Sequence, residues 1–222
     1  SGDVSNVLMI QKISDLFDES VPVLISSGMS NFKDLQNSID ILRKKKNRLI
    51  IPMQCTSLYP TKPKEWGLNN IKKLLDKFPP KVGFSDHSGD IYSSLAAITL
   101  GAEVIEAHIV FSKNAFGPDT SSSLTPKQFK TLINGVRQIK EALLNPFNKD
   151  ISNAKLNDCK VIFQKRIVAS KSIKKGEVIN SENLKTIKGI NEGVLDKNVF
   201  RIIGKTSKKE YKLNQPIKEE DF

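Results

Sequence analysis

Val82-Gly-Phe-Ser-Asp-His-Ser88 and Val104-Ile-Glu-Ala-His-Ile-Val-Phe111 together contain both histidines of the chain, His87 and His108. Each histidine lies at or near the end of a short apolar run that predicts a buried strand. A helical pattern from Ile91 to Leu100 joins the two runs. Strand, helix and strand in this order predict two parallel strands with a right-handed crossover. We therefore expect both imidazoles at the C-terminal edge of one sheet, where parallel α/β folds bind ligands.

Two imidazoles from neighbouring strands, with acidic side chains nearby, can bind a divalent metal. The acidic candidates are Asp86, Glu106 and Asp119. The alternative is a pair of unrelated histidines, one buried and one on a loop, because single histidines are usually structural or incidental. The residue pattern alone leaves both interpretations open.

Length and composition limit the class of protein. The 222 residues allow one large domain, or a large and a small one, and a hydrophobic content of 38% is enough for a core. No stretch approaches the roughly 20 apolar residues of a membrane span, and Ser1-Gly2-Asp3 does not begin a secretory signal. The two cysteines, Cys55 and Cys159, are far apart and lack a metal-ligand spacing. We expect a reducing, cytoplasmic location and no membrane partner.

The net charge of +11 can attract nucleic acid or an anionic substrate. The lysines are spread along the chain, however, and no basic stripe with interleaved aromatic residues and no nucleic-acid motif is present. We therefore expect no nucleic-acid partner. A generally positive field would still help to collect an anionic substrate.

The order of predicted elements favours repeated βα units. Apolar runs at residues 21–25, 49–57, 82–88 and 104–111 predict strands, and a helical pattern follows each of them. Four units are half of an eight-fold barrel, or a small doubly wound sheet. The chain has no GxGxxG fingerprint, which argues against dinucleotide binding. A helical pattern without a preceding strand opens the chain, so we expect it to be part of a longer polypeptide.

Three segments after predicted strands are candidates for binding. Ser26-Ser-Gly-Met-Ser30 can direct N–H groups and hydroxyls at a phosphate, and a plain turn with a helix cap explains it equally well. Tyr59 lies on a proline-rich loop and can wall a pocket or pack beneath the loop. The polar loop from Ser112 to Leu124 occupies a position that often carries function. It ends before Thr125, which predicts a helix start with a capping box.

After about residue 145 the pattern weakens into a polar linker, and the rest of the chain predicts a separate, small β-rich domain. Within it, Arg166–Ala169 and Ile173–Ile179 predict short strands round a Lys-Gly turn, and Ser181–Leu184 predicts one capped helical turn. A similar pattern returns weakly at the end of the chain, where Asn214 takes the position of Gly176. Asparagine, like glycine, tolerates a positive φ.

The order of these motifs resembles the sialic acid (N-acylneuraminate) synthase family over essentially the whole chain. The tail is similar to that family's C-terminal antifreeze-like (SAF) domain. The resemblance implies the second half of a TIM-type (β/α)8 barrel in residues 1–145, a linker in residues 146–164 and an SAF domain in residues 165–222. The matching segments are Ser1-Gly-Asp3, Leu24-Ile-Ser-Ser-Gly-Met29, Gln54-Cys-Thr-Ser-Leu-Tyr-Pro60, Gly83-Phe-Ser-Asp-His87, Ile105-Glu-Ala-His108, Gly117-Pro-Asp119, Ile173-Lys-Lys-Gly-Glu177 and Ser181-Glu-Asn-Leu184.

The family that the chain resembles condenses phosphoenolpyruvate with an N-acylated amino sugar, giving a nonulosonic acid and phosphate. It uses a divalent metal, typically Mn²⁺, with Mg²⁺ or Co²⁺ as alternatives, and the resemblance implies His87 and His108 as its ligands. The metal would polarise the sugar aldehyde. The resemblance also implies catalytic roles for Asp3 and Asp119, and substrate-binding roles for Ser1, Ser26, Ser57, Tyr59, Ser85 and Lys188.

By the same resemblance the protein is expected to be a homodimer, in which the tail domain covers the partner's active site. An arginine of the family's tail domain contacts the N-acyl group, and here that position is Lys188, followed by Gly189. Lysine cannot make the planar bidentate contact of arginine, so we expect a different acylamino sugar. Ala107 and Phe116 also depart from the family pattern, which normally has a basic residue and a proline there.

Two functions remain open from the sequence. One is a metal-dependent synthase of a sialic-type acid, of which this chain is a part. The other is a catalytically incomplete fragment that acts as a carbohydrate-binding or structural module. The second interpretation is motivated by Lys188 and by the absence of the family's first half barrel, whose lysines and glutamate bind phosphoenolpyruvate.

Overall fold

The computed structural model describes residues 2–18, 20–44, 48–149, 151 and 154–222. The chain divides into two compact units, Ser1–Pro146 and Phe147–Phe222, and each has its own hydrophobic core. Helix α6 (Ala154–Phe163) lies within the segment that the sequence predicts as a linker. Among the described residues, no helix is both long and apolar enough to cross a membrane.

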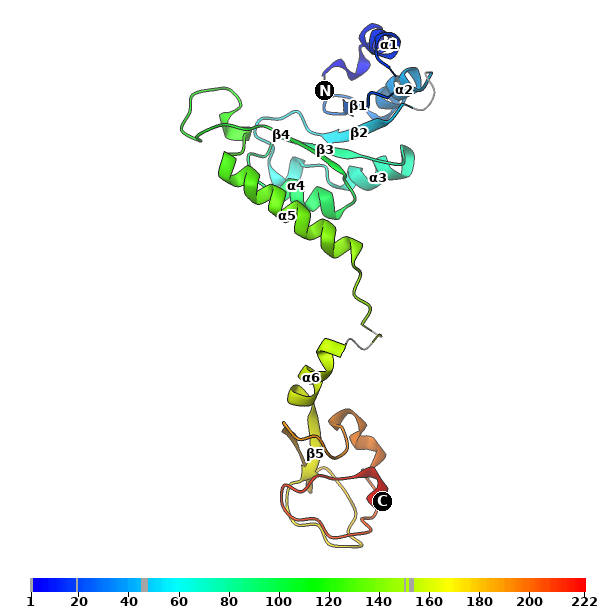
Figure 1. Ribbon diagram of the computed structural model, residues 1–222, viewed down its shortest axis with the longest axis vertical. Coiled ribbons are helices and arrows are strands. Elements are labelled where there is room, and N and C mark those ends of the chain that lie inside the picture. Colours follow the sequence, from blue (N-terminus) through cyan, green and yellow to red (C-terminus); the bar gives the residue numbers. More distant parts are fainter. Residues whose placement is uncertain (1, 19, 45–47, 150, 152–153) are drawn as a thin grey trace. The chain divides into compact units, whose positions relative to one another are not determined.

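The first unit is built on one parallel sheet (Figure 1). Its strands lie in the order β1-β2-β3-β4, which is also their order in the chain. A doubly wound sheet reverses its strand order at a switch point, whereas a barrel adds each strand beside the last. The predicted half of a (β/α)8 barrel is therefore confirmed. The strands are β1 (Val23–Ser26), β2 (Ile50–Cys55), β3 (Gly83–Asp86) and β4 (Val104–Ala107).

Helices accompany the strands in alternation. All residues of β2 and β3 are buried, as expected for the inner strands of a parallel sheet. The predicted capping box is present at the start of the last helix of this unit, where Gln128 Oε1 accepts from the Thr125 N–H at 2.9 Å. The helices are α1 (Val7–Leu16), α2 (Phe32–Arg43), α3 (Asn69–Lys77), α4 (Tyr92–Thr99) and α5 (Pro126–Leu144), with 3-10 turns η1 (Gly2–Ser5), η2 (Pro63–Glu65) and η3 (Thr120–Ser122).

A buried arginine satisfies the carbonyl groups at the end of α1. Arg48 is 7% exposed, and it donates to Ile13 O at 3.5 Å and to Asp18 O at 3.3 Å, as well as to Phe17 O. The last carbonyls of a helix have no partner inside the helix, and a cation there is also favoured by the helix dipole. Arg48 therefore connects the segment before β2 to the end of α1.

We expect Arg48→Met to lower the free energy of unfolding by about 1–3 kcal/mol, because buried carbonyl groups lose a charged donor. Chemical denaturation followed by circular dichroism measures the change. The matched control is Arg43→Met, whose side chain is exposed near the end of α2 and which should cost less than about 0.5 kcal/mol. Equal losses in the two variants would contradict this role of Arg48.

The second unit contains a small antiparallel sheet. Strands β5 (Lys165–Ala169) and β6 (Leu184–Lys188) pair with Ile167 opposite Thr186. The sequence predicts β5 but not β6, whose burial does not alternate in the manner of a half-buried strand. Pairing with β5 forms β6, which neighbouring residues alone do not indicate. Two 3-10 turns, η4 (Asp196–Arg201) and η5 (Glu219–Asp221), complete this unit.

The repeated pattern in the tail is present in the backbone. Gly176 has a φ of 86° and Asn214 a φ of 66°, so Asn214 adopts the positive φ that its position predicts. The segment Ile173–Ile179 has the predicted turn, at Gly176, but the residues on each side of it do not form full strands. They make single β-bridges, from Ile173 to Tyr211 and from Val178 to Thr206.

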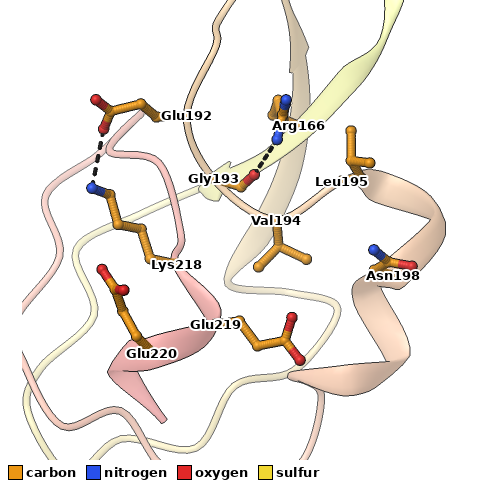
Figure 2. Close-up of a pocket in the computed structure, with 9 residues that line it drawn as sticks. All are labelled: Arg166, Glu192, Gly193, Val194, Leu195, Asn198, Lys218, Glu219 and Glu220. Carbon is orange, nitrogen blue, oxygen red and sulfur yellow. Dashed lines mark hydrogen bonds and ion pairs between the residues drawn. The ribbon is translucent and has the colours of Figure 1, made fainter.

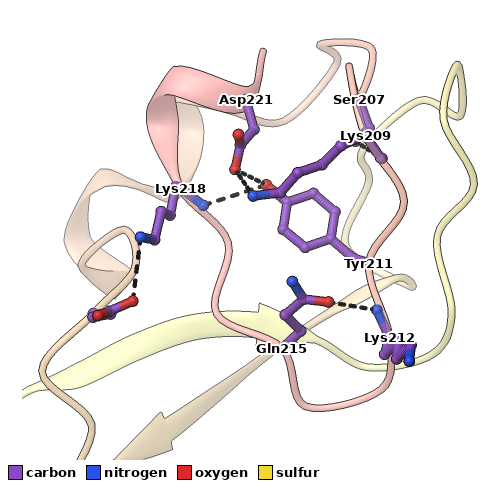
Figure 3. Close-up of polar contacts among 8 residues, drawn as sticks. Ser207, Lys209, Tyr211, Lys212, Gln215, Lys218 and Asp221 are labelled. Atoms are coloured by element: carbon purple, nitrogen blue, oxygen red, sulfur yellow. Dashed lines mark hydrogen bonds and ion pairs between the residues drawn. The ribbon is translucent and has the colours of Figure 1, made fainter.

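A polar network around Tyr211 joins the end of the chain to the segment before it (Figure 3). The Tyr211 ring is fully buried, and its hydroxyl donates to Asp221 Oδ2 at 2.7 Å. Lys209 Nζ lies 2.6 Å from the same oxygen. Burial and the bond to Asp221 raise the pKa of Tyr211. Burial alone would raise the pKa of Asp221, but its contacts with Lys209 and Tyr211 outweigh burial and lower it.

We expect Asp221→Asn to destabilise the chain by about 1 kcal/mol near neutral pH, because the Tyr211 hydroxyl and Lys209 lose a charged partner. The folded pKa of Asp221 lies below its unfolded value of about 3.9. Its contribution is therefore complete above that pH and is lost as the pH falls through the folded pKa. Thermal denaturation between about pH 3 and pH 7 should show the difference from wild type shrinking with acid. Glu220→Gln, at an exposed neighbour, is the control, and a pH-independent difference for Asp221→Asn would contradict the assignment.

Candidate functional site

The two histidines lie side by side at the C-terminal edge of the sheet. Asp86, the last residue of β3, pairs with Ala107, the last residue of β4, so His87 and His108 follow at the same level. Their ring centroids are 5.2 Å apart, with an interplanar angle of 64°. The structure thus brings together the pair that the sequence places on neighbouring strands.

His87 is the more enclosed of the two. It is 5% exposed, and its Nδ1 lies 3.0 Å from Thr56 O and 3.9 Å from Cys55 Sγ. Burial lowers the pKa of His87, but its hydrogen bonds to Cys55 and Thr56 outweigh burial and raise the pKa. Burial raises the pKa of Cys55, and the bond to His87, with smaller contributions, lowers it overall. The two groups therefore favour each other's charged forms.

Tyr59 forms a wall beside both histidines. Its ring centroid is 4.3 Å from that of His87 and 5.8 Å from that of His108. Tyr59 is 47% exposed, so one side of the ring faces solvent. Of the two alternatives for Tyr59, the structure favours a residue that lines the site over one that packs beneath the loop.

The side chains at this edge can hold a divalent metal through two imidazoles. Thr56 O can only accept a hydrogen bond, so a neutral His87 imidazole bonded to it has its proton on Nδ1 and a lone pair on Nε2 for a ligand. His108 Nδ1 lies 3.7 Å from Asp119 Oδ2, an ion pair when the imidazole is protonated. Across the described residues, no group of three or more histidine, cysteine or acidic side chains is arranged around one metal position. A metal at this edge would take its remaining ligands from water or substrate.

Asp86, one of the three acidic candidates, is buried and already has several hydrogen-bond partners. Asp86 is 3% exposed, and its Oδ2 accepts from the hydroxyls of Ser93 and Ser94. Its Oδ1 accepts from the backbone N–H of Ser88 at 2.8 Å. Asp86 therefore connects the end of β3 to the start of α4 through these hydrogen bonds. Its possible contribution to a metal site stays a prediction.

Three predicted serines lie at or near the C-terminal ends of neighbouring strands. Ser26, the last residue of β1, has a buried hydroxyl without a hydrogen-bond partner. Ser57 Oγ lies 3.8 Å from Cys55 Sγ. Ser85 Oγ donates to Glu106 Oε1 at 2.6 Å, across the β3–β4 pair. An unpaired buried hydroxyl marks Ser26 as able to meet a polar ligand.

The remaining predicted residues are Ser1, Asp3 and Lys188. Asp3 is in η1, and with Ser26 it lines a hollow of about 130 Å³. Lys188 is the exposed last residue of β6, in the second unit. Ser1 lies outside the described residues. The roles of these three residues stay predictions.

The second unit has a hollow of its own, about 440 Å³ in volume (Figure 2). Arg166 Nη1 donates to Gly193 O at 2.7 Å, and Lys218 Nζ pairs with Glu192 Oε2 at 3.2 Å. Gly193 has a φ of +98°, and a Cβ there would lie 3.2 Å from Ile167 O. Lys188 does not line this hollow. The sequence analysis assigned no role to these residues.

A second feature not predicted from the sequence is the set of buried hydrogen bonds between β2 and the segment around Glu65 and Trp66. Gln54 is 5% exposed, and its Nε2 lies 3.3 Å from Trp66 O and 3.5 Å from Thr56 Oγ1. Thr56 Oγ1 donates to Glu65 O at 2.7 Å. The available signal is a glutamine inside an otherwise apolar buried strand, because buried polar side chains nearly always have specific partners.

Comparison with known proteins gives two family matches that together cover most of the chain. The model of the NeuB family matches residues 1–147, and that of the SAF domain matches residues 166–222. The chain is 35% identical to an N,N'-diacetyllegionaminic acid synthase of Campylobacter jejuni, over 99% of this chain and 64% of that protein. It is 32% identical to the human N-acetylneuraminate-9-phosphate synthase, over 92% of this chain and 56% of that protein. The chain thus spans between about half and two thirds of these relatives.

Solved structures have the same architecture. An N-acetylneuraminic acid (sialic acid) synthetase from Leptospira borgpetersenii, in complex with citrate, superposes with a TM-score of 0.61 at 27% identity, over 71% of this chain and 53% of that one. The spore coat polysaccharide biosynthesis protein spsE of Bacillus subtilis superposes with a TM-score of 0.60 over 99% of this chain and 65% of that one. At 23% identity, the second likeness concerns the fold alone. With the family matches, these structures confirm the half barrel and the SAF domain.

We expect the two cysteines to differ in reactivity toward a thiol reagent. Cys159 is exposed, whereas Cys55 is 5% exposed beneath His87. One thiol per folded chain should react quickly. Cys55 should react at least about tenfold more slowly, because a reagent reaches it only when the residues that cover it at the C-terminal edge of the sheet move away. Cys159→Ser should remove the fast phase. A fast thiol that remains in Cys159→Ser would contradict the enclosed position of Cys55.

Proposed function

The chain belongs to the NeuB family, and we propose that the protein containing it is a sialic-acid-type synthase. Such an enzyme condenses phosphoenolpyruvate with an N-acylated amino sugar to give a nonulosonic acid and phosphate. The observation that carries the proposal is the pair of imidazoles, His87 and His108, 5.2 Å apart at the ligand-binding edge of a half barrel. The names of the relatives, among them legionaminic, pseudaminic and N-acetylneuraminate-9-phosphate synthases, support this reaction class.

His87 and His108 would hold the divalent metal, which we propose to be Mn²⁺, with Mg²⁺ or Co²⁺ as alternatives. The position of Thr56 O, 3.0 Å from Nδ1 of His87, supports this role, because a hydrogen bond there directs Nε2 toward a ligand. When bound, the metal would supply Lewis-acid polarisation of the sugar aldehyde. Asp119, 3.7 Å from His108, is close enough to orient a water molecule or the histidine itself.

The hydroxyl groups at the strand ends would bind phosphoenolpyruvate. Ser26 supports this most directly, since its hydroxyl is buried and unpaired. Ser57 and Ser85 lie at the ends of the next two strands, and Ser85 would exchange its bond to Glu106 for one to the substrate. Tyr59 and Asp3 would face the sugar, and the positive net charge of +11 would favour the approach of an anionic substrate.

Further features of the proposal concern the second unit. Lys188 would approach the N-acyl group from the SAF domain of a partner subunit in a homodimer. A lysine ammonium makes single hydrogen bonds where an arginine makes two, so the preferred acyl group would differ from that of arginine-containing relatives. We also propose a cytoplasmic location, consistent with two free cysteines.

The test is phosphate release from phosphoenolpyruvate by the protein that contains this chain, with Mn²⁺ and a panel of N-acylated amino sugars. We expect release with one sugar, and loss of release with a chelator. His87→Gln combined with His108→Gln should weaken Mn²⁺ binding by at least about tenfold, because both nitrogen ligands are removed.

The matched control is Glu103→Gln, next to β4 at the opposite edge of the sheet, which should leave Mn²⁺ affinity unchanged. Unchanged Mn²⁺ affinity in the double variant would overturn the metal role. Saturable binding of an acylamino sugar with no phosphate release from any sugar would favour the alternative, a carbohydrate-binding or structural module.

A further inference from the structure

The loop after β2 encloses His87 from three directions. Thr56 O accepts from Nδ1 of His87 at 3.0 Å, and the backbone N–H of Thr61 donates to His87 O at 3.0 Å. The Tyr59 ring lies against the imidazole, with 4.3 Å between ring centroids. The orientation of His87 therefore depends on the loop after β2 as well as on β3, which carries the histidine.

That loop is held from the opposite face of the sheet by buried polar groups. Thr56 Oγ1 donates to Glu65 O at 2.7 Å, which joins the first residue after β2 to the turn η2. The Gln54 amide lies behind them, 3.3 Å from Cys55 O and 3.3 Å from Trp66 O, and its Oε1 accepts from Asn70 Nδ2 at 3.2 Å. These bonds restrict the direction of the Thr56 carbonyl.

Gly67 leaves room for this arrangement. It has a φ of +64°, and a Cβ there would lie 2.4 Å from Gln54 Nε2. A side chain at position 67 would displace the Gln54 amide. We call the hydrogen bonds of Gln54 and the Thr56 hydroxyl, which hold the Thr56 carbonyl in place, the clamp. Gly67 provides the space that the Gln54 amide occupies.

We propose that Thr56, held by its hydroxyl group and by Gln54, is a positioning residue that fixes the Nδ1–H tautomer of His87. A carbonyl oxygen accepts but cannot donate, so a fixed Thr56 O selects the imidazole form with the proton on Nδ1. Nε2 then keeps its lone pair for a metal or another electrophile. Partners of this kind orient metal-binding histidines, and their loss typically costs about 10–100-fold in metal affinity.

His108 has no equivalent clamp among the described residues. Its Nδ1 lies 3.7 Å from Asp119 Oδ2, which is too long for a good hydrogen bond, and Asp119 lies on a polar loop with a 52% exposed side chain. His87 is thus the ligand that is oriented before anything binds, and His108 is the adaptable one. The inference rests on the proposed metal role of His87 for its consequence, but not for the tautomer itself.

The first measurement is the ¹⁵N spectrum of the imidazoles in the 222-residue chain without metal. Selective labelling of histidine gives signals from two residues only, and His108→Asn assigns them. In wild type, at a pH where the titration of the ¹⁵N signals shows a neutral imidazole, we expect His87 to carry its proton on Nδ1. Thr56→Val should shift His87 toward a mixture of tautomers, and Thr56→Ser, which restores the hydroxyl, should return it to Nδ1–H.

The matched control is Thr131→Val, which removes a hydroxyl bond of the same kind, from Thr131 Oγ1 to Lys127 O at 3.0 Å, on exposed α5. It should leave the His87 spectrum unchanged. If Thr56→Val does not fold, Gln54→Met provides the second variant, with the same direction of change expected. A folded Thr56→Val or Gln54→Met protein with an unaltered Nδ1–H signal would overturn the proposal.

The second measurement is Mn²⁺ affinity by calorimetry. Thr56→Val should weaken binding about tenfold and Thr131→Val should leave it unchanged. A wild-type protein that keeps the Nδ1–H tautomer but binds no Mn²⁺ would contradict the proposed function and leave the positioning role of Thr56 standing. A shifted tautomer with unchanged Mn²⁺ affinity would instead show that the clamp does not serve metal binding.

Discussion

The parallel pairing of β3 with β4 is the constraint on which the site depends. Asp86 and Ala107 are partners in the ladder, so the next residue of each strand, His87 or His108, emerges at the same height. A shift of one residue would turn one imidazole to the other face of the sheet, because side chains alternate along a strand. The buried carboxylate of Asp86 adds to this constraint by accepting from Ser93 and Ser94 at the start of α4.

Two sets of residues fix His87 at the C-terminal edge of the sheet: one contacts the imidazole, and the other holds the loop that carries the first. Thr56 O and the Tyr59 ring contact His87 directly. Behind them, Gln54 and the Thr56 hydroxyl hold the loop through the backbone of Glu65 and Trp66. In a site that is partly closed to water, such fully paired groups limit the orientations of an imidazole more strongly than packing alone. The same enclosure explains why Cys55 and His87 perturb each other's pKa.

The second unit depends on local polar contacts rather than on a large sheet. Its one strand pair leaves much of the backbone in turns, and single β-bridges and the Tyr211–Asp221 bond hold these turns together. Gly193 lets two segments approach closely, since a Cβ would meet the carbonyls of Ile167 and Ile217 at 3.2 Å. A small domain with a limited core gains more from such paired, partly buried groups than a large one does.

The order of residues was enough to predict the four βα units, the capping box at Thr125, the positive φ of Asn214 and the meeting of the two histidines. These features follow from periodicity and from local backbone preferences, which act within a few residues. Three features become visible only in the folded chain: the strand β6, the bonds from Ser93 and Ser94 to Asp86, and the contact of Thr56 with His87. The physical reason is that hydrogen-bond partners such as Thr56 and His87 lie 31 residues apart, and only the pairing of strands brings them together.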